Sequence, residues 1–178
     1  MENENNEILF ECNYTRTKSI LNEFNLYYCF KQPKFIVCDT MFAFLAVSNI
    51  IMLIMGDPQK FEASLIVIAL VYLFLKILIF RVRRIAIKRE LEINSNQPVI
   101  VNSAVFQDYI EITLSNNGTK SSVCFSNIKK AVKTRNLIIL ITQANLYYLF
   151  PKDAFINNSS NDFIAFLKSK GIKIHYCK

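Results

Sequence analysis

The chain has 178 residues, of which 52% are hydrophobic, and 21 basic against 14 acidic residues give it a formal net charge of +7. Three glycines and four prolines exclude collagen-like and proline-rich architectures, and the hydrophobic share excludes a mainly disordered chain. A single histidine excludes multi-histidine metal sites, and the length allows one domain or at most two.

The N-terminal segment, residues 1–34, is predicted to hold a short strand at 7–14 and an amphipathic helix at 15–30. In the helix, Ile20, Leu21, Phe24 and Tyr28 recur at helical spacing. We expect this helix to lie on a bilayer surface or to pack against the rest of the chain.

The apolar excess is concentrated in residues 35–80, which we predict to be a transmembrane helical hairpin. The first stretch, 35–55, spans about 31 Å as a helix, close to the roughly 30 Å hydrocarbon core of a bilayer. The second, 65–80, spans about 24 Å on the same arithmetic and is expected to continue through Arg81. Gly56-Asp57-Pro58 is a turn signal between them. The alternative, two helices buried in a soluble core, needs more apolar surface than the remaining chain offers.

Flanking charge sets the expected orientation. Nine basic residues flank the two stretches, whereas the tip from 56 to 64 carries only Lys60. This excess predicts a two-span protein of the cell membrane with both termini in the cytoplasm. The cluster that follows the second stretch is a candidate site for anionic lipid head groups and explains the basic balance without nucleic acid. Its residues are Arg81, Arg83, Arg84, Lys88 and Arg89.

Three polar residues inside the spans are candidate functional residues, because ionisable groups in a membrane are costly. Asp39 and Lys76 lie toward the cytoplasmic ends of their helices, and we expect them to pair with each other or to reach the interface. Asn49 lies deeper and is placed to bond across the helices. Two helices are too few for a transporter unless the protein forms a homo-oligomer, which the sequence leaves open.

Residues 81–98 are predicted to be a helix that leaves the membrane, ending near residue 93, and a linker. Residues 99–178 then change to a period of two and form a cytoplasmic domain. Its predicted strands are 99–102, 109–114, 122–125, 128–134, 137–142, 145–150 and 172–176, with a helix at 162–170 that Gly171 caps. The predicted fold class is therefore an α+β membrane protein, a helical hairpin plus a curved sheet or barrel with one C-terminal helix, as in pleckstrin-homology domains.

The chain resembles the YcxB-like family of bacterial membrane proteins over nearly its whole length. The resemblance includes the N-terminal strand and helix, the two apolar stretches, the basic residues that follow them and the C-terminal domain. The resemblance rests on residues 128–135, the hydrophobic strand at 137–141, the aromatic strand that ends in Pro151-Lys152, and Phe155. It implies a C-terminal domain like the bacterial pleckstrin-homology domains. It implies no agreed activity, and it supplies no catalytic residue.

Catalytic chemistry has little support in the sequence. The five cysteines show no CxxC spacing, and we expect them to be reduced thiols. The only histidine, His175, is a weak partner for a catalytic cysteine. Catalytic and phosphate-binding motifs such as HExxH, GxSxG or a P-loop do not occur. We therefore predict that the protein is not an enzyme and has no cofactor and no metal site. If it were an enzyme or a transporter subunit, Asp39, Lys76 and His175 would be the candidate titratable residues.

The expected function is a non-enzymatic, membrane-anchored binding module that recognises a protein, a peptide or a lipid at the inner leaflet. Tyr147 and Lys152 are the candidate partner surface, because Lys152 follows the end of a strand and Tyr147 alternates with Tyr148. A more specific form is immunity to a bacteriocin or toxin. The alternative is an accessory or structural subunit of a larger membrane complex or transporter.

Overall fold

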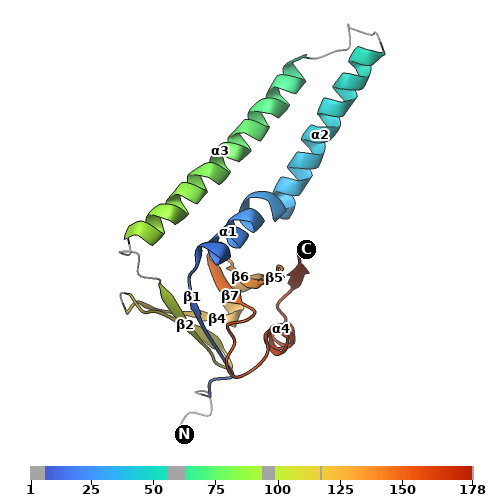
Figure 1. Cartoon of the computed structure of the whole chain (residues 1–178). Helices are drawn as coiled ribbons and strands as arrows, with labels where there is room; N and C mark the ends of the chain where they lie inside the picture. Colours follow the sequence, from blue (N-terminus) through green and yellow to red (C-terminus); the bar gives the residue numbers. More distant parts are fainter. Residues whose placement is uncertain (1–6, 56–62, 94–98, 117, 178) are drawn as a thin grey trace. The chain divides into compact units, whose positions relative to one another are not determined.

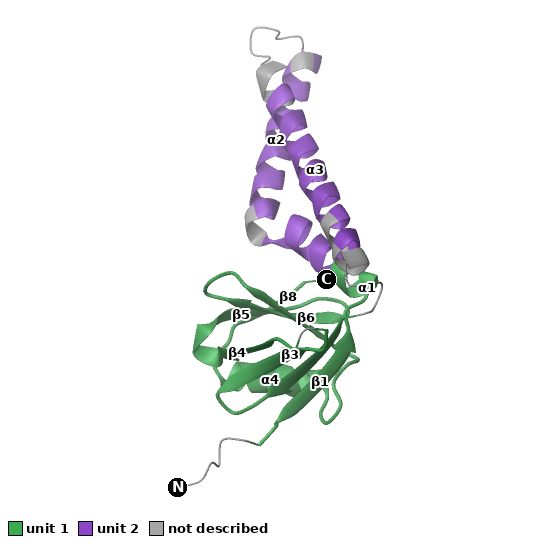
Figure 2. Cartoon of the chain, turned by 90° about the vertical axis from the view of Figure 1, so that its left-hand side faces the viewer, with its two compact units in different colours: residues 1–21, 90–178 green, residues 22–89 purple. Residues whose placement is uncertain are grey.

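The computed structural model describes residues 7–55, 63–93, 99–116 and 118–177 (Figure 1). Inside the helices, only the backbone is described at 33, 34, 53, 63–66, 86, 87 and 90–93. The chain divides into two units, unit 1 (residues 1–21 and 90–178) and unit 2 (residues 22–89), coloured green and purple in Figure 2. The predicted turn at Gly56-Asp57-Pro58 and the linker at 94–98 lie outside the described residues.

The first sheet of unit 1 has the strand order β1-β2-β3-β4, and every neighbouring pair is antiparallel. Alternation of buried and exposed side chains, for example buried Ile110 and Ile112, gives it one core face and one solvent face. Gly118, in the β3–β4 turn, has a φ of +64°, which glycine adopts without steric cost. The strands are β1 (Phe10–Thr15), β2 (Ile100–Val105), β3 (Tyr109–Leu114) and β4 (Lys120–Cys124).

The second sheet has the order β7-β6-β5-β8, in which β8 runs parallel to β5. Strand β6 is buried along its whole length, which explains its uninterrupted apolar sequence. Pro151 ends β7 at an edge of the sheet, where a missing N–H is tolerated. A 3₁₀ turn, η3 (Phe125–Asn127), leads into β5 (Ile128–Lys133), β6 (Leu137–Thr142), β7 (Tyr147–Pro151) and, after α4, β8 (Ile174–Tyr176).

Helix α4 (Ser160–Ser169) completes the core of unit 1. Ser159 and Asp162 form a reciprocal capping box at its start. At its end, Gly171 has a φ of +77°, and its N–H donates to Lys168 O while Ile172 N–H donates to Leu167 O, which is a Schellman motif. The cap predicted at Gly171 is confirmed.

Phenylalanine rings fill the space between α4 and the sheets. Phe163 of α4 is fully buried, and its ring lies 5.2–5.4 Å from those of Phe10, Phe150 and Phe155. These separations are in the favourable range for aromatic pairs. The core therefore joins β1, from the N-terminal segment, to β7 and the C-terminal helix.

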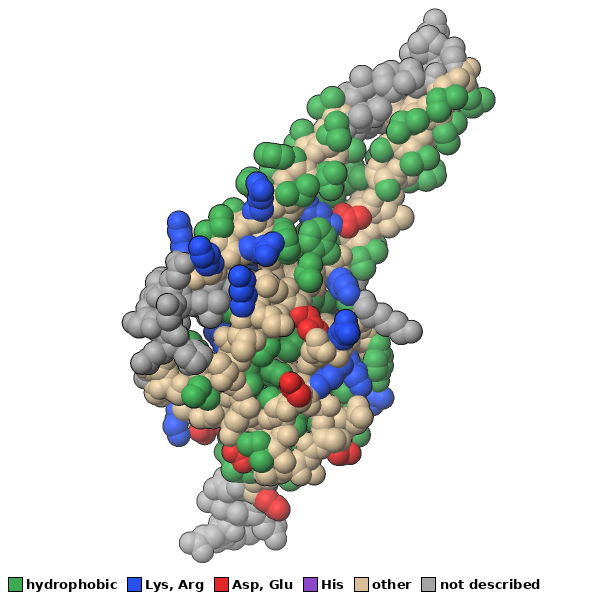
Figure 3. All heavy atoms as spheres, in the orientation of Figure 1, with side chains coloured by type: hydrophobic (Ala, Val, Ile, Leu, Met, Phe, Trp, Pro, Cys, Tyr) green, Lys and Arg blue, Asp and Glu red, His purple; other side chains and the backbone are tan. Residues whose placement is uncertain are grey.

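Unit 2 contains the long helices. Helix α1 (Lys18–Leu26) begins in unit 1 and ends in unit 2, and a π-helical turn, η2 (Tyr27–Lys31), follows it. Helix α2 (Pro33–Ile54) and helix α3 (Ala63–Ile93) then cover both predicted apolar stretches and the helix expected to leave the membrane. Figure 3 shows hydrophobic side chains along the described surfaces of both long helices.

By length and composition, one stretch of the described residues qualifies to cross a bilayer: Phe35–Met52, with a mean hydropathy of 2.0 and only 6% of it buried. A stretch of the same length starting at Val67 already contains Lys76, Arg81, Arg83 and Arg84. The side chains of Leu65 and Ile66, at the start of the second predicted span, lie outside the described set. The predicted two-helix transmembrane hairpin is therefore not confirmed.

The mixed α+β class, with two sheets and a C-terminal helix, is confirmed. One relationship was not predicted: β1, which the sequence analysis placed in a separate N-terminal segment, pairs along its length with β2. Unit 2 is therefore an insertion between the first two strands of one sheet.

Candidate functional site

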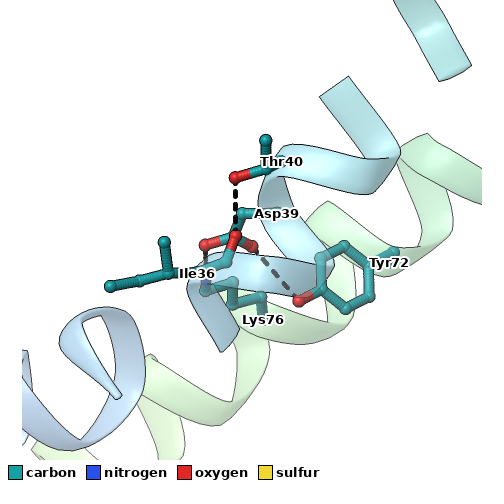
Figure 4. A network of polar contacts seen from close by, with 5 residues as sticks. All are labelled: Ile36, Asp39, Thr40, Tyr72 and Lys76. Atoms are coloured by element: carbon teal, nitrogen blue, oxygen red, sulfur yellow. Dashed lines mark hydrogen bonds and ion pairs between the residues drawn. The ribbon is translucent and has the colours of Figure 1, made fainter. Parts of the chain in front are cut away.

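A polar network joins the two long helices of unit 2 (Figure 4). Asp39 of α2 accepts hydrogen bonds from the Lys76 ammonium through Oδ2 and from the Tyr72 hydroxyl through Oδ1, the latter at 3.1 Å. Tyr72 and Lys76 are four residues apart on α3, so they share a face of that helix. Of the two outcomes expected for Asp39 and Lys76, the structure has the ion pair. Sequence reasoning missed Tyr72, which the i, i+4 spacing from Lys76 would have suggested.

Aromatic rings surround the cationic end of this network. The Lys76 ammonium lies 5.0 Å from the centre of the Phe30 ring and 5.9 Å from that of Phe35. Phe42 stacks on Tyr72 with ring centres 4.4 Å apart. Lys76 is only 8% exposed, whereas the Asp39 side chain is 39% exposed. The arrangement pairs a largely buried lysine charge with a carboxylate and with the faces of aromatic rings.

A cavity of about 510 Å³ adjoins the network between α2 and α3. Its polar lining comes from Asp39, Tyr72 and Lys76, and the remainder is apolar. Small side chains, Ala43, Ala46 and Ala69, lie on its walls. The cavity therefore offers apolar volume with one polar end.

Asn49 and Ser48, deeper in α2, make hydrogen bonds within their own helix. Asn49 Nδ2 and Ser48 Oγ both donate to Leu45 O at 3.0 Å. Asn49 is buried. The bond across helices predicted for Asn49 stays a prediction.

The structure divides the basic cluster of α3. The Arg83 guanidinium lies 3.5 Å from the centre of the Tyr28 ring and 6.0 Å from that of Phe24, so it is fixed against aromatic faces. The other four members, Arg81, Arg84, Lys88 and Arg89, are exposed. Burial raises the pKa of the nearby Cys29 thiol, and the charge of Arg83 opposes that rise.

In unit 1, the predicted partner residues have different environments. Tyr147 is half-buried on β7 and pairs with Ile141 of β6. The Lys152 ammonium donates to the backbone oxygens of Thr134 and Arg135 at 2.5 and 2.6 Å, so it fastens the β5–β6 turn. The Lys152 ammonium is thus used in contacts within the fold. That Lys152 forms part of a partner surface stays a prediction.

The five cysteines form no disulfide bond. All five cysteines are free; Cys12 and Cys29 are buried, and Cys38 and Cys124 are exposed. Burial, with a smaller contribution from Asp153, raises the pKa of Cys12 to about 12. His175, on β8, is the register partner of Val132 on β5. Within the described ranges, histidine, cysteine and carboxylate side chains form no group of three that is placed to hold a metal ion.

Comparison with known proteins gives one finding for this part of the fold. The model of the YcxB-like protein family matches residues 107–167, from just before β3 to within α4. The chain has no significant match among curated proteins. The match contains residues 128–155, which carry the most specific part of the resemblance. The N-terminal segment and unit 2 lie outside it, so the resemblance predicted over nearly the whole length stays a prediction there. Residues 107–167 are thus similar to the YcxB-like protein family.

Proposed function

We propose that the chain is a non-enzymatic, membrane-anchored binding module. In this proposal unit 2 is the anchor, and unit 1 is a domain of the pleckstrin-homology type that recognises a protein, peptide or lipid at the inner leaflet. The observation that carries the proposal is the insertion of unit 2 between two strands that pair with each other.

The pairing supports a two-span anchor by a topological argument. Thr15, at the end of β1, and Ile100, at the start of β2, are register partners, so they lie on the same side of any membrane. If α2 crosses the bilayer through Phe35–Met52, the chain must cross again before it reaches Ile100. Helix α3 has 31 residues and a length of about 47 Å, enough for the return.

Charge supports the cytoplasmic side for both ends. Figure 3 shows Lys and Arg side chains gathered toward the end of α3 that leads to β2, beyond the hydrophobic part of the helix. Exposed Arg81, Arg84 and Arg89 belong to this group. Positive charge next to an apolar span favours the cytoplasmic face and attracts anionic head groups.

The architecture of unit 1 supports the pleckstrin-homology comparison. The order of elements is the one expected for a domain of this type. Four antiparallel strands are followed by three more and by one helix, whose buried Phe163 packs it on the core. Strand β8 adds an edge to the second sheet after that helix. Because a fold does not fix a function, the binding role rests on the sequence, in which recognised catalytic motifs do not occur.

Cysteine labelling in cells tests the anchor. In a variant that keeps Cys124 alone, a membrane-impermeant maleimide should react only after permeabilisation, because Cys124 is exposed on unit 1. In a matched variant with Gln59→Cys as the sole thiol, the reagent should react on intact cells. Labelling of Cys124 on intact cells, or purification of the chain without detergent, would contradict the proposal. Co-purification in mild detergent followed by mass spectrometry then searches for the partner.

A second candidate is an accessory subunit of a larger membrane complex. The cavity between α2 and α3, with its alanine-lined walls, favours this reading because small residues let another helix approach closely. Ala46→Phe should then release co-purifying membrane proteins while leaving the anchor inserted. Phe44→Ala, at a side chain that is 72% exposed, is the control. If only the chain itself is recovered from wild-type cells, the subunit role is excluded.

Immunity to a toxin or bacteriocin is the most specific form of the binding-module proposal. It is supported only by the combination of an anchor and a binding domain in a small chain. Deletion of the gene should sensitise the producing strain to its own peptide. Unchanged survival beside a neighbouring toxin gene would remove this form and leave the binding module in place.

A further inference from the structure

The net charge of the chain is carried by its C-terminal part. Residues 1–124 contain twelve basic and twelve acidic residues, whereas residues 125–178 contain nine basic and two acidic ones. The latter build η3, the second sheet and α4. One half of unit 1 therefore holds the full excess of +7.

The register brings two of these lysines together. Ala131 of β5 pairs with Ile174 of β8, and Ala131 N–H donates to Lys173 O at 2.9 Å. Lys130 and Lys173 are the preceding residues on the two segments, so they are lateral neighbours, and side chains of lateral neighbours leave a sheet on the same face. Two like charges in this position repel each other and lower stability.

Lys129 directly precedes Lys130 in the chain, at the irregular start of β5, and adds a third positive charge. Lys129 and Lys173 are exposed and Lys130 is half-buried. Among the described residues, none of the three forms a salt bridge. We call Lys129, Lys130 and Lys173 the basic patch.

The two acidic residues of this half have other neighbours. Asp162 is held in the capping box with Ser159, and Asp153 lies close enough to Cys12 of β1 to raise the pKa of its thiol. Lys170, at the end of α4, pairs with Asp108 at 3.5 Å. In Figure 3, Lys and Arg side chains gather on the side of unit 1 where Figure 1 places β8 and α4. Since the described residues form no salt bridge with the basic patch, an external anion would reduce the repulsion within it.

We propose that the basic patch binds the anionic head groups of the membrane in which the chain is anchored. This inference rests on the proposed function for the anchor, and it names lipid as the partner of this face. Because both connections to unit 2 leave unit 1 at paired residues, unit 1 stays within reach of a bilayer. Each lysine near an anionic surface strengthens binding about fivefold. Cations spread over separate segments of a sheet match a layer of phosphates better than one extended acidic peptide.

Lysine labelling of the full chain in nanodiscs tests the proposal. The discs contain zwitterionic lipid alone or with added phosphatidylglycerol, and mass spectrometry gives the labelling rate of each lysine. We expect anionic lipid to slow labelling of Lys129, Lys130 and Lys173, and added salt to restore it. Lys120, exposed on β4 in the other sheet, is the internal reference and should not change.

Variants sharpen the test. Lys173→Gln should reduce the protection of Lys129 about fivefold, whereas Lys120→Gln, the matched single change in the other sheet, should leave it unaltered. Equal labelling of the three lysines in both kinds of disc overturns the lipid assignment. It is also overturned if added oligoglutamate protects these lysines in zwitterionic discs, because the partner would then be an acidic peptide. If the chain fails to insert into discs at all, the proposed anchor has failed instead. Both faces of a nanodisc are open to reagent, so the result does not depend on the orientation in cells.

Discussion

Thr15 and Ile100 are register partners at the ends of β1 and β2, although the whole of unit 2 lies between them in the chain. A sheet closed in this way forces the inserted segment to begin and end at neighbouring points. An inserted segment that enters a bilayer must therefore leave it on the same side. The pairing thus relates the register of one sheet to the number of membrane crossings, which hydropathy alone does not fix.

The ion pair between Asp39 and Lys76 yields a prediction on stability. Lys76→Met leaves the Asp39 carboxylate without its cation beside an apolar cavity. Breaking a fully buried pair costs about 3–5 kcal/mol, and since Asp39 is partly exposed we expect about 2 kcal/mol. Thermal unfolding in detergent measures the loss. Asp39→Asn combined with Lys76→Met should recover most of it, because no uncompensated charge remains. A double variant as unstable as Lys76→Met would contradict this account.

The sequence predicts the elements of this fold well, because their signals are local. The alternation at 109–114 and the apolar run at 137–142 give β3 and β6 their observed bounds. Pro151 and Gly171 end their elements for reasons carried by single residues, a missing N–H and a positive φ.

Relationships between distant residues are what the sequence does not provide. The partner of β1 lies beyond two long helices, and no periodicity in residues 7–14 specifies it. Asp39 and Lys76 stand out because charges in apolar helices are rare. The spacing from Lys76 puts Tyr72 on the same face of α3, but its hydrogen bond to Asp39 depends on how the two helices pack. The proximity of Lys130 and Lys173 likewise depends on the parallel addition of β8.

Cys12 gives a prediction on pH. Its pKa is about 12 in the folded chain against an ordinary value of 9.0, so the folded state keeps the thiol protonated. The stability from this group is complete below pH 9 and is lost as pH rises from there toward 12, because the unfolded chain releases the proton first. The full loss is on the order of 4 kcal/mol. Denaturant midpoints of wild type and Cys12→Ala across this range measure it. The variant should show a shallower alkaline slope, and parallel slopes would contradict the burial of the thiol.

The start of α4 gives a prediction on local capping. Ser159→Ala removes the side-chain oxygen that accepts the Asp162 N–H and should lower the free energy of unfolding by about 1 kcal/mol. Ser159→Asp keeps an acceptor at the same place and should recover most of that loss. Ser169→Ala, near the exposed end of the same helix, is the control. Equal effects at Ser159 and Ser169 would mean that the cap contributes nothing specific.

Arg83 yields a prediction that separates charge from shape. Its guanidinium stacks on Tyr28 with 3.5 Å to the ring centre, a contact that uses the planar fork of arginine. Arg83→Lys keeps the charge but loses the stacking, so we expect unit 2 to lose about 1 kcal/mol of stability in detergent unfolding. Arg81→Lys, at an exposed position two residues earlier, should leave stability unchanged. The Tyr28→Leu background supplies the decisive comparison, because Arg83→Lys should then have almost no further effect. An undiminished loss in that background would show that Arg83 acts through some other contact.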